Sequence, residues 1–258
     1  MLIALTREVS PNIGKCELTH IPRKGIDFKK ARSQHIKYER VLRNLGCQIR
    51  RIPEEPDLPD SVFVEDTAII LDEIALIARP GAESRREETR SVAEFLNEYR
   101  TIFEVVSPGI LDGGDVLQIG RTLYVGITSR TNESGIQQLT NYVSPYGYKV
   151  VKVQAPGCLH LKSAVTLVGE GTLLINRSWV DARPFGDKKF IDIHPSEPYA
   201  ANALLVEGEL VYPMTFPKTY RRLDEERISI RVVDISELQK AEGAVTCCSL
   251  IFKEKVTT

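Results

Sequence analysis

Reactive side chains lie where short apolar segments of the chain begin. They comprise carboxylates, an imidazole and thiols, and their positions are Glu65-Asp66, Asp112 with Asp115, His160, Asn202 and Cys247-Cys248. A thiol, an imidazole and carboxylates are the groups that covalent catalysis needs, because the imidazole acts on the nucleophile or leaving group and a carboxylate orients the imidazole. These residues are far apart in the sequence, so the chemistry requires a fold that brings the segment starts together.

Each of these residues also has a structural interpretation. His160 alone is more typical of a hydrogen-bonded core histidine, and Cys247 and Cys248 could be small buried apolar side chains. Glu65 and Asp66 could belong to a solvated turn before a strand. Their shared placement at the starts of similar segments favours a common site.

The segments that follow these residues form a repeat. Each copy has an apolar strand, a short turn containing Gly, Asp or Glu, and a second apolar strand, and the copies begin at residues 66, 115, 163, 202 and 248. Turns of this composition are typical of β-hairpins. The last copy has room for one strand only, so we expect residues 2–5 to pair with it and close a ring. Gly113 and Gly114 would allow close approach of the backbone beside Asp112, although a bulge would also explain them.

Amphipathic helical segments follow most of the hairpins, at residues 28–45, 83–99, 132–142 and 236–240. Hairpins alternating with helices in five units predict an α/β fold, a five-bladed α/β propeller around a pseudo-fivefold axis, rather than a doubly wound sheet. A generic mixed α/β sheet with accidental spacing is the alternative. Because no linker divides the chain, we expect one domain spanning residues 1–258.

The composition of the 258 residues favours a small-molecule partner. Lys and Arg number 34 and Asp and Glu number 35, which gives a net charge of −1 and no support for a nucleic-acid or membrane-surface partner. The N-terminal residues lack the features of a signal peptide, and no apolar run is long enough to span a membrane, so we expect a cytoplasmic location. The five cysteines include no CxxC pair, which predicts free thiols and no structural zinc.

Seven sequence segments around the reactive residues resemble those of the dimethylarginine dimethylaminohydrolase family, which belongs to the pentein (guanidine-modifying) superfamily. The resemblance covers nearly the whole chain, and the segments are 60–66, 79–86, 111–116, 130–132, 159–163, 200–202 and 243–249. The family fold is a five-bladed propeller of ββαβ units, which agrees with the repeat described above.

The resemblance implies roles for individual residues. Cys247 corresponds to the nucleophile, His160 to the general acid/base and Asp112 to the carboxylate that orients it, whereas Cys248 is expected to be a packing residue. Residues that correspond to the substrate-binding positions supply carboxylates, guanidinium groups and backbone carbonyls, and they are Asp60, Glu65, Asp66, Arg85, Arg130, Leu18 and Ala241. Within this set the two arginines would hold the substrate α-carboxylate, and the carbonyls would meet its α-amino group.

The implied activity is hydrolysis of N-ω-methylated arginine, as asymmetric dimethylarginine or monomethylarginine, to citrulline and dimethylamine or methylamine. The reaction would pass through a thiouronium on Cys247 without an organic cofactor, and zinc bound by Cys247 and His160 would inhibit it. Carboxylates around Cys247 should raise the thiol pKa in the empty site, and a bound cation should lower it again. The resemblance also suggests a homodimer.

Two other function classes stay open at the level of the sequence. One is a different guanidine-modifying enzyme, such as an arginine deiminase or a hydrolase of another guanidino or ureido compound. The other is a non-catalytic propeller that only binds guanidino ligands or partner proteins. In any of these, residues 13–26 could form a lid, and residues 177–198 could shape the entrance or an interface. We expect His20, His35 and His194 to lie on the surface or in loops, away from the repeat starts.

Overall fold

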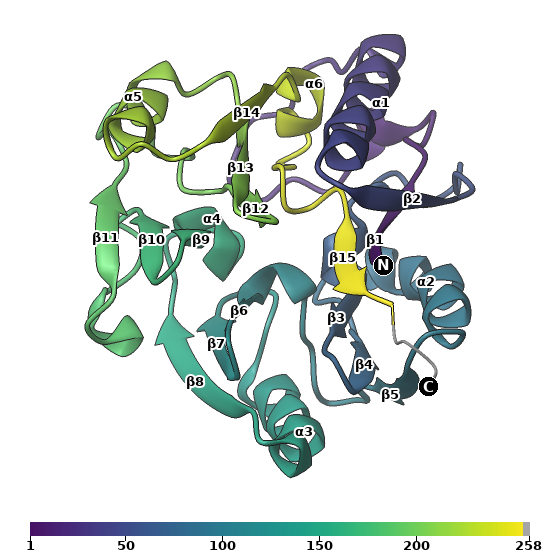
Figure 1. Cartoon of the computed structure of the whole chain (residues 1–258). Coiled ribbons are helices and arrows are strands. Elements are labelled where there is room, and N and C mark those ends of the chain that lie inside the picture. Colours follow the sequence, from purple (N-terminus) through teal and green to yellow (C-terminus); the bar gives the residue numbers. More distant parts are fainter. Residues whose placement is uncertain (255–258) are drawn as a thin grey trace.

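Five three-stranded β-sheets form a ring in the computed structural model, which describes residues 1–254 (Figure 1). Every sheet has the same order, an antiparallel pair followed by a third strand that is parallel to the second. From the axis outward, the sheets are β15 (Leu250–Lys253), β1 (Leu2–Arg7) and β2 (Cys47–Ile52); β3 (Ala68–Ile70), β4 (Ile74–Ile77) and β5 (Thr101–Glu104); β6 (Val116–Ile119), β7 (Thr122–Ile127) and β8 (Lys149–Gln154); β9 (Val165–Gly169), β10 (Thr172–Ile175) and β11 (Lys189–Asp192); β12 (Leu204–Val206), β13 (Glu209–Pro213) and β14 (Ile230–Val233). The predicted five-bladed α/β propeller is therefore confirmed.

The ring closes between the two ends of the chain, as the sequence predicted. Strand β15 pairs antiparallel with β1, with Leu2 opposite Lys253 and Leu5 opposite Leu250. The first and last strands therefore complete one blade. The loop before β15 then lies beside the blade formed by β3, β4 and β5.

The first strand of each hairpin begins one or two residues later than the sequence suggested. Three of the repeat starts are short helical turns, η2 (Val64–Thr67), η4 (Gly113–Asp115) and α4 (Leu161–Ala164). In the first of these turns the hydroxyl of Thr67 donates to the carbonyl of Val64, which satisfies a backbone acceptor that an extended strand would have paired in a sheet. The reactive residues consequently lie on tight turns that precede the innermost strand of each of these blades.

Helices connect the second and third strands of most blades and lie on the outside of the ring (Figure 1). They are α1 (Phe28–Asn44), α2 (Thr89–Leu96), α3 (Glu133–Val143) and α5 (Pro217–Glu225), and shorter turns are η1 (Ile13–Lys15), η3 (Glu83–Glu88), η5 (Ser144–Tyr146), η6 (Arg183–Phe185) and α6 (Ser236–Gln239). Helix α1 begins at the capping side chain of Asp27 and ends before Gly46, whose φ of 91° is readily adopted only by glycine. Helix α5 was not predicted from the sequence; its side chains Tyr220 and Leu223 pack in the adjacent apolar cluster.

Apolar side chains fill the space between the sheets and these outer helices. The expectation that His35 lies on the surface is wrong: it is buried on the inner face of α1, with Nδ1 3.6 Å from Glu39 Oε1. All five cysteines are free thiols, as predicted. None of the helices in residues 1–254 combines the length and apolar character that crossing a membrane requires.

Candidate active site

A small pocket at one end of the propeller axis brings together residues from several blades. Cys247 lies in the loop between α6 and β15, and its carbonyl accepts a hydrogen bond of 3.1 Å from the backbone N–H of Glu65. Its pocket is also lined by six residues predicted from the sequence to form the site, namely Asp60, Asp66, Arg85, Arg130, His160 and Ala241. The fold therefore assembles most of the predicted site around one thiol.

His160 is held between two carboxylates. Its Nε2 lies 3.0 Å from Asp112 Oδ2, and its Nδ1 lies 3.7 Å from Asp66 Oδ1. Burial alone would lower the pKa of the imidazole, but Asp66 and the hydrogen bond to Asp112 raise it from 6.5 to about 9. At neutral pH the empty site therefore holds an imidazolium, which is the form that can protonate a leaving amine.

Two adjacent glycines allow these groups to meet. A Cβ on Gly113 would lie 2.0 Å from the carbonyl oxygen of Glu65, and a Cβ on Gly114 would lie 2.6 Å from Nδ1 of His160. The N–H of Gly114 donates to Asp66 Oδ1 at 3.1 Å. The expectation of close backbone approach at these glycines is confirmed, since any side chain would separate the turns that carry the reactive residues.

Asp66 is a buried carboxylate that remains ionised. Burial tends to raise its pKa, but the neighbouring His160 and Arg85 lower it to about 2. Arg85 Nη1 donates to Asp66 Oδ2 at 2.7 Å, and its Nε and Nη2 donate to the carboxylate of Glu88. In this structure, Arg85 thus fixes the orientation of Asp66, in addition to lining the pocket. Sequence reasoning missed Glu88, although its position three residues after Arg85 is the spacing of a helical ion pair.

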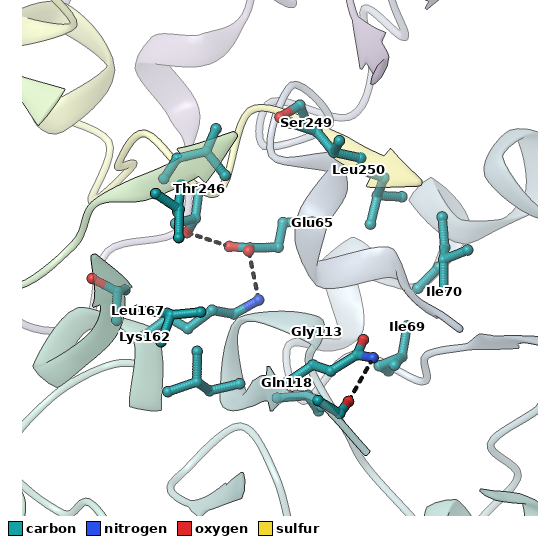
Figure 2. Close-up of a pocket in the computed structure, with 18 of the residues that line it drawn as sticks. Glu65, Ile69, Ile70, Gly113, Gln118, Lys162, Leu167, Thr246, Ser249 and Leu250 are labelled. Carbon is teal, nitrogen blue, oxygen red and sulfur yellow. Dashed lines mark hydrogen bonds and ion pairs between the residues drawn. The ribbon is translucent and has the colours of Figure 1, made fainter. Parts of the chain in front are cut away.

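Glu65 lines a different cavity from the thiol pocket. Figure 2 shows its carboxylate between Lys162 Nζ, at 2.5 Å, and Thr246 Oγ1, at 2.6 Å. These three residues line a larger cavity along the propeller axis, together with the first strands of the blades. Of the predicted substrate-binding carboxylates, the structure therefore brings Asp60 and Asp66 into the thiol pocket, whereas Glu65 lies in an ion pair with Lys162, which sequence reasoning did not single out.

The thiol of Cys247 has a pKa raised well above its usual value. The causes are desolvation and the negative charges of Glu65 and Asp66. This agrees with the expectation from the sequence, with desolvation as the larger cause. Cys248, next to it, is fully buried and packs in the core, as expected.

Arg130, Asp60 and Glu17, which belongs to the predicted lid segment (residues 13–26), also line the pocket. Arg130 is buried, and its Nη2 donates to Thr19 Oγ1 at 3.0 Å. Asp60 Oδ2 accepts from the backbone N–H of Glu17 at 2.9 Å. Leu18 lies between these two contacts in the chain, so its backbone is held close to the pocket. An arginine next to a carboxylate provides complementary partners for the α-carboxylate and α-amino groups of an amino acid.

Asp66, Asp112 and His160 offer ligand atoms within 4.8 Å of one another, which is a spacing that a metal ion could use. Cys247 does not belong to that group. The group therefore differs from the zinc site predicted from the sequence, which consisted of Cys247 and His160. Because His160 is held as an imidazolium by the same two carboxylates, a metal ion would have to displace its proton.

A ring of five three-stranded blades with a thiol, an imidazole and carboxylates in one pocket defines a hydrolase of the pentein superfamily. The family model described as "N,N dimethylarginine dimethylhydrolase, eukaryotic" matches residues 21–193. The N(G),N(G)-dimethylarginine dimethylaminohydrolase of Streptomyces coelicolor is 40% identical over 97% of this chain and 97% of its own length. The chain belongs to the dimethylarginine dimethylaminohydrolase family.

Further relatives agree with this assignment. The N(G),N(G)-dimethylarginine dimethylaminohydrolase of Pseudomonas aeruginosa is 33% identical over 88% of this chain and 90% of its own length. A solved structure of a cysteine-to-serine variant of the Pseudomonas aeruginosa enzyme in complex with citrulline has a TM-score of 0.92 and 30% identity, and covers 96% of this chain and 98% of its own. The similarity therefore extends through every blade.

Proposed function

We propose that this protein hydrolyses N-ω-methylated arginine to citrulline and methylamine or dimethylamine, with Cys247 as the nucleophile. The observation that carries the proposal is the shared pocket of Cys247, His160 and the anionic Asp66, which Arg130 also lines. That arrangement fits a ligand with a cationic head and an α-carboxylate tail. The names of the relatives and the citrulline complex support the same substrate class.

Substrate binding follows from the charges in the pocket. A guanidinium is a planar cation with parallel N–H donors, and a fixed carboxylate such as Asp66 accepts from it with good geometry. At the other end, Arg130 would bind the α-carboxylate, and Asp60 with the carbonyls of Leu18 and Ala241 would bind the α-amino group. Arg85 would contribute mainly by holding Asp66, since its donors are directed to Asp66 and Glu88.

The nucleophile would be activated by the substrate itself. In the empty site the thiol pKa is raised, because burial desolvates the thiolate and because ionisation would add an anion beside Glu65 and Asp66. A bound guanidinium supplies the compensating positive charge, so it favours loss of the thiol proton to solvent. His160 is already protonated at neutral pH, and therefore keeps its proton for the leaving group.

The bond changes then follow in two steps. The thiolate of Cys247 attacks the guanidinium carbon, and the C–N bond to the methylated nitrogen breaks as His160 transfers its proton to the departing amine. This leaves a thiouronium on Cys247 and a neutral imidazole. The imidazole next removes a proton from water, which attacks the thiouronium carbon, and cleavage of the C–S bond releases citrulline. Asp112 keeps Nε2 of His160 oriented throughout, and the scheme requires no organic cofactor.

The experiment is an assay for citrulline and for the released amine with dimethylarginine, monomethylarginine and arginine as substrates. We expect turnover of both methylated substrates at a higher kcat/KM than arginine. Cys247→Ser should abolish turnover, whereas the matched variant Cys248→Ala, at the neighbouring thiol, should keep it. Faster turnover of arginine would indicate a deiminase instead, and an active Cys247→Ser variant would exclude Cys247 as the nucleophile.

A further inference from the structure

The turn that follows helix α6 contains a residue with an unusual backbone conformation. The N–H of Gly243 donates to the carbonyl of Leu238 at 3.0 Å, which is the hydrogen bond of a helix ending in a left-handed residue. That left-handed residue is Glu242, with a φ of 58°. Glycine is the usual residue at such a position, because any side chain there costs conformational energy. Contacts made by the Glu242 side chain can offset this cost.

The side chain of Glu242 contacts the backbone of the lid segment. Its Oε2 accepts from the N–H of Thr19 at 2.9 Å, and its Oε1 accepts from the N–H groups of His20 and Ile21. Three consecutive backbone N–H groups therefore surround one carboxylate, which is a strong arrangement for holding an anion. Thr19 and His20 are exposed residues, so little apolar burial holds this part of the lid segment in place.

The position of Glu242 connects this contact to the substrate pocket. Glu242 itself lines the pocket, between Ala241 and Gly243, in the segment that leads to Cys247. The lid residues that it holds directly follow Leu18, whose carbonyl is expected to meet the substrate α-amino group. Gly243, the residue after Glu242, packs closely on Phe63. A Cβ on Gly243 would lie 2.2 Å from the Phe63 ring, so this segment has little freedom to move. The anchor point of the lid segment is consequently rigid.

We propose that Glu242 is a positioning residue that fastens residues 19–21 of the lid segment over the substrate pocket and thereby aligns the backbone of Leu18 with the bound amino acid. The kinetic consequence rests on the proposed function, whereas the fastening itself does not. Without the carboxylate, the lid segment would lose its hydrogen bonds to the rigid segment and would exchange between open and closed positions. Part of the free energy of substrate binding would then be needed to close the lid segment, so the apparent affinity would fall.

The variant Glu242→Gly separates the two roles of this residue, because glycine suits the left-handed backbone and removes the carboxylate. Glu207→Gly is a matched control, since Glu207 also has a positive φ, of 47°, but lies exposed in the β12–β13 turn. Glu242→Gln retains an acceptor oxygen and should have an intermediate effect. Both glycine variants remove one negative charge and relieve the same kind of strain, so they differ in the contact to the lid segment.

Hydrogen exchange of a peptide covering residues 17–23 measures the fastening directly, without any substrate. We expect exchange in Glu242→Gly to be at least about tenfold faster than in the native protein, with Glu207→Gly unchanged. In the amine-release assay, KM for dimethylarginine should rise at least about tenfold in Glu242→Gly, with a smaller change in kcat. Unchanged exchange in Glu242→Gly, or an equal rise of KM in Glu207→Gly, would overturn the proposal. If the native protein releases no amine, the proposed function fails, and the exchange rates alone decide whether Glu242 fastens the lid segment.

Discussion

The pKa of His160 can be shifted by one substitution that preserves shape, Asp112→Asn. Asp112 is fully buried, with Oδ2 3.0 Å from Nε2 of His160 and Oδ1 2.9 Å from the N–H of Gly81. An asparagine can keep the bond to Gly81 through its oxygen, which leaves its amide N–H facing the imidazole. An N–H donor can bond only to an unprotonated ring nitrogen, so the substitution favours the neutral imidazole.

The size of the shift follows from the bond that is lost. A hydrogen bond to a charged group contributes about 1.5–3 kcal/mol, and one pKa unit corresponds to about 1.4 kcal/mol, so we expect a decrease of about one to two units. The pKa of His160 should therefore fall from about 9 to between about 7 and 8 in the variant. Asp66 remains 3.7 Å from the other ring nitrogen, so the pKa should not fall below its ordinary value of 6.5 through loss of Asp112 alone.

The same shift predicts how stability depends on pH. Because the folded-state pKa of His160 is raised, its contribution to the free energy of unfolding is complete below pH 6.5 and is lost as the pH rises through about 9. The full difference corresponds to about 3 kcal/mol. In Asp112→Asn this contribution should be smaller by about 1.5–3 kcal/mol at low pH, and should be lost as the pH rises through about 7 to 8.

The assays are an NMR titration of the imidazole and chemical denaturation at pH 6 and pH 9.5. In the pH profile of kcat/KM, the alkaline limb should move to lower pH in Asp112→Asn, because the imidazolium that we propose protonates the amine is lost at lower pH. Asp57→Asn, at an exposed carboxylate, removes the same charge and should leave all three measurements unchanged. An imidazole pKa that stays near 9 in Asp112→Asn would refute the assignment of Asp112 as the partner that raises it.

Three other measurements address separate features of the site. Gly114→Ala should reduce kcat/KM at least about a hundredfold, because the new methyl group would lie 2.6 Å from Nδ1 of His160; steady-state kinetics of a variant that still unfolds cooperatively checks this, and near-native activity would contradict it. Lys162→Met leaves the carboxylate of Glu65 without its ammonium partner and should lower the free energy of unfolding by about 3 kcal/mol, measured by urea denaturation, whereas an unchanged midpoint would show that the pair is not stabilising. The pH dependence of alkylation of Cys247 should shift to lower pH when a cationic guanidino ligand is bound, and equal thiol pKa values with and without the ligand would refute substrate-assisted ionisation.

The blades could be predicted from the sequence because each hairpin is a local structure. Its two strands and its turn lie within about a dozen residues, so the apolar pattern and the turn residues specify it without information from the rest of the chain. Closure of the ring between residues 2–5 and β15 then follows from the single unpaired strand that remains. The resemblance to a known family assigned the site residues, and the structure brings most of them into one pocket.

The features that were missed depend on contacts between distant residues. Lys162 and Glu65 are 97 positions apart, so neither the pair nor the direction of the Glu65 carboxylate can be read from either motif. His35 lies on helix α1, which is rich in basic residues. The face of the helix that carries His35 is buried only because the helix packs against the blade of β15, β1 and β2. Glu242 looks like an ordinary surface glutamate in the sequence, since a left-handed backbone is expected at glycine rather than at glutamate.

The charges around the thiol explain why an unreactive empty site is compatible with catalysis. Asp66 is an anion that is balanced by the cations of His160 and Arg85, and Arg85 is in turn balanced by Glu88. Ionisation of Cys247 would add an anion without a partner to this buried set, so the thiol stays protonated. A guanidinium that enters beside Asp66 supplies the absent partner at the place where the thiolate must attack. Substrate binding and activation of the thiol would then be one event. The ureido group of the product is neutral and cannot stabilise the thiolate, so the thiol would be protonated again when the product leaves.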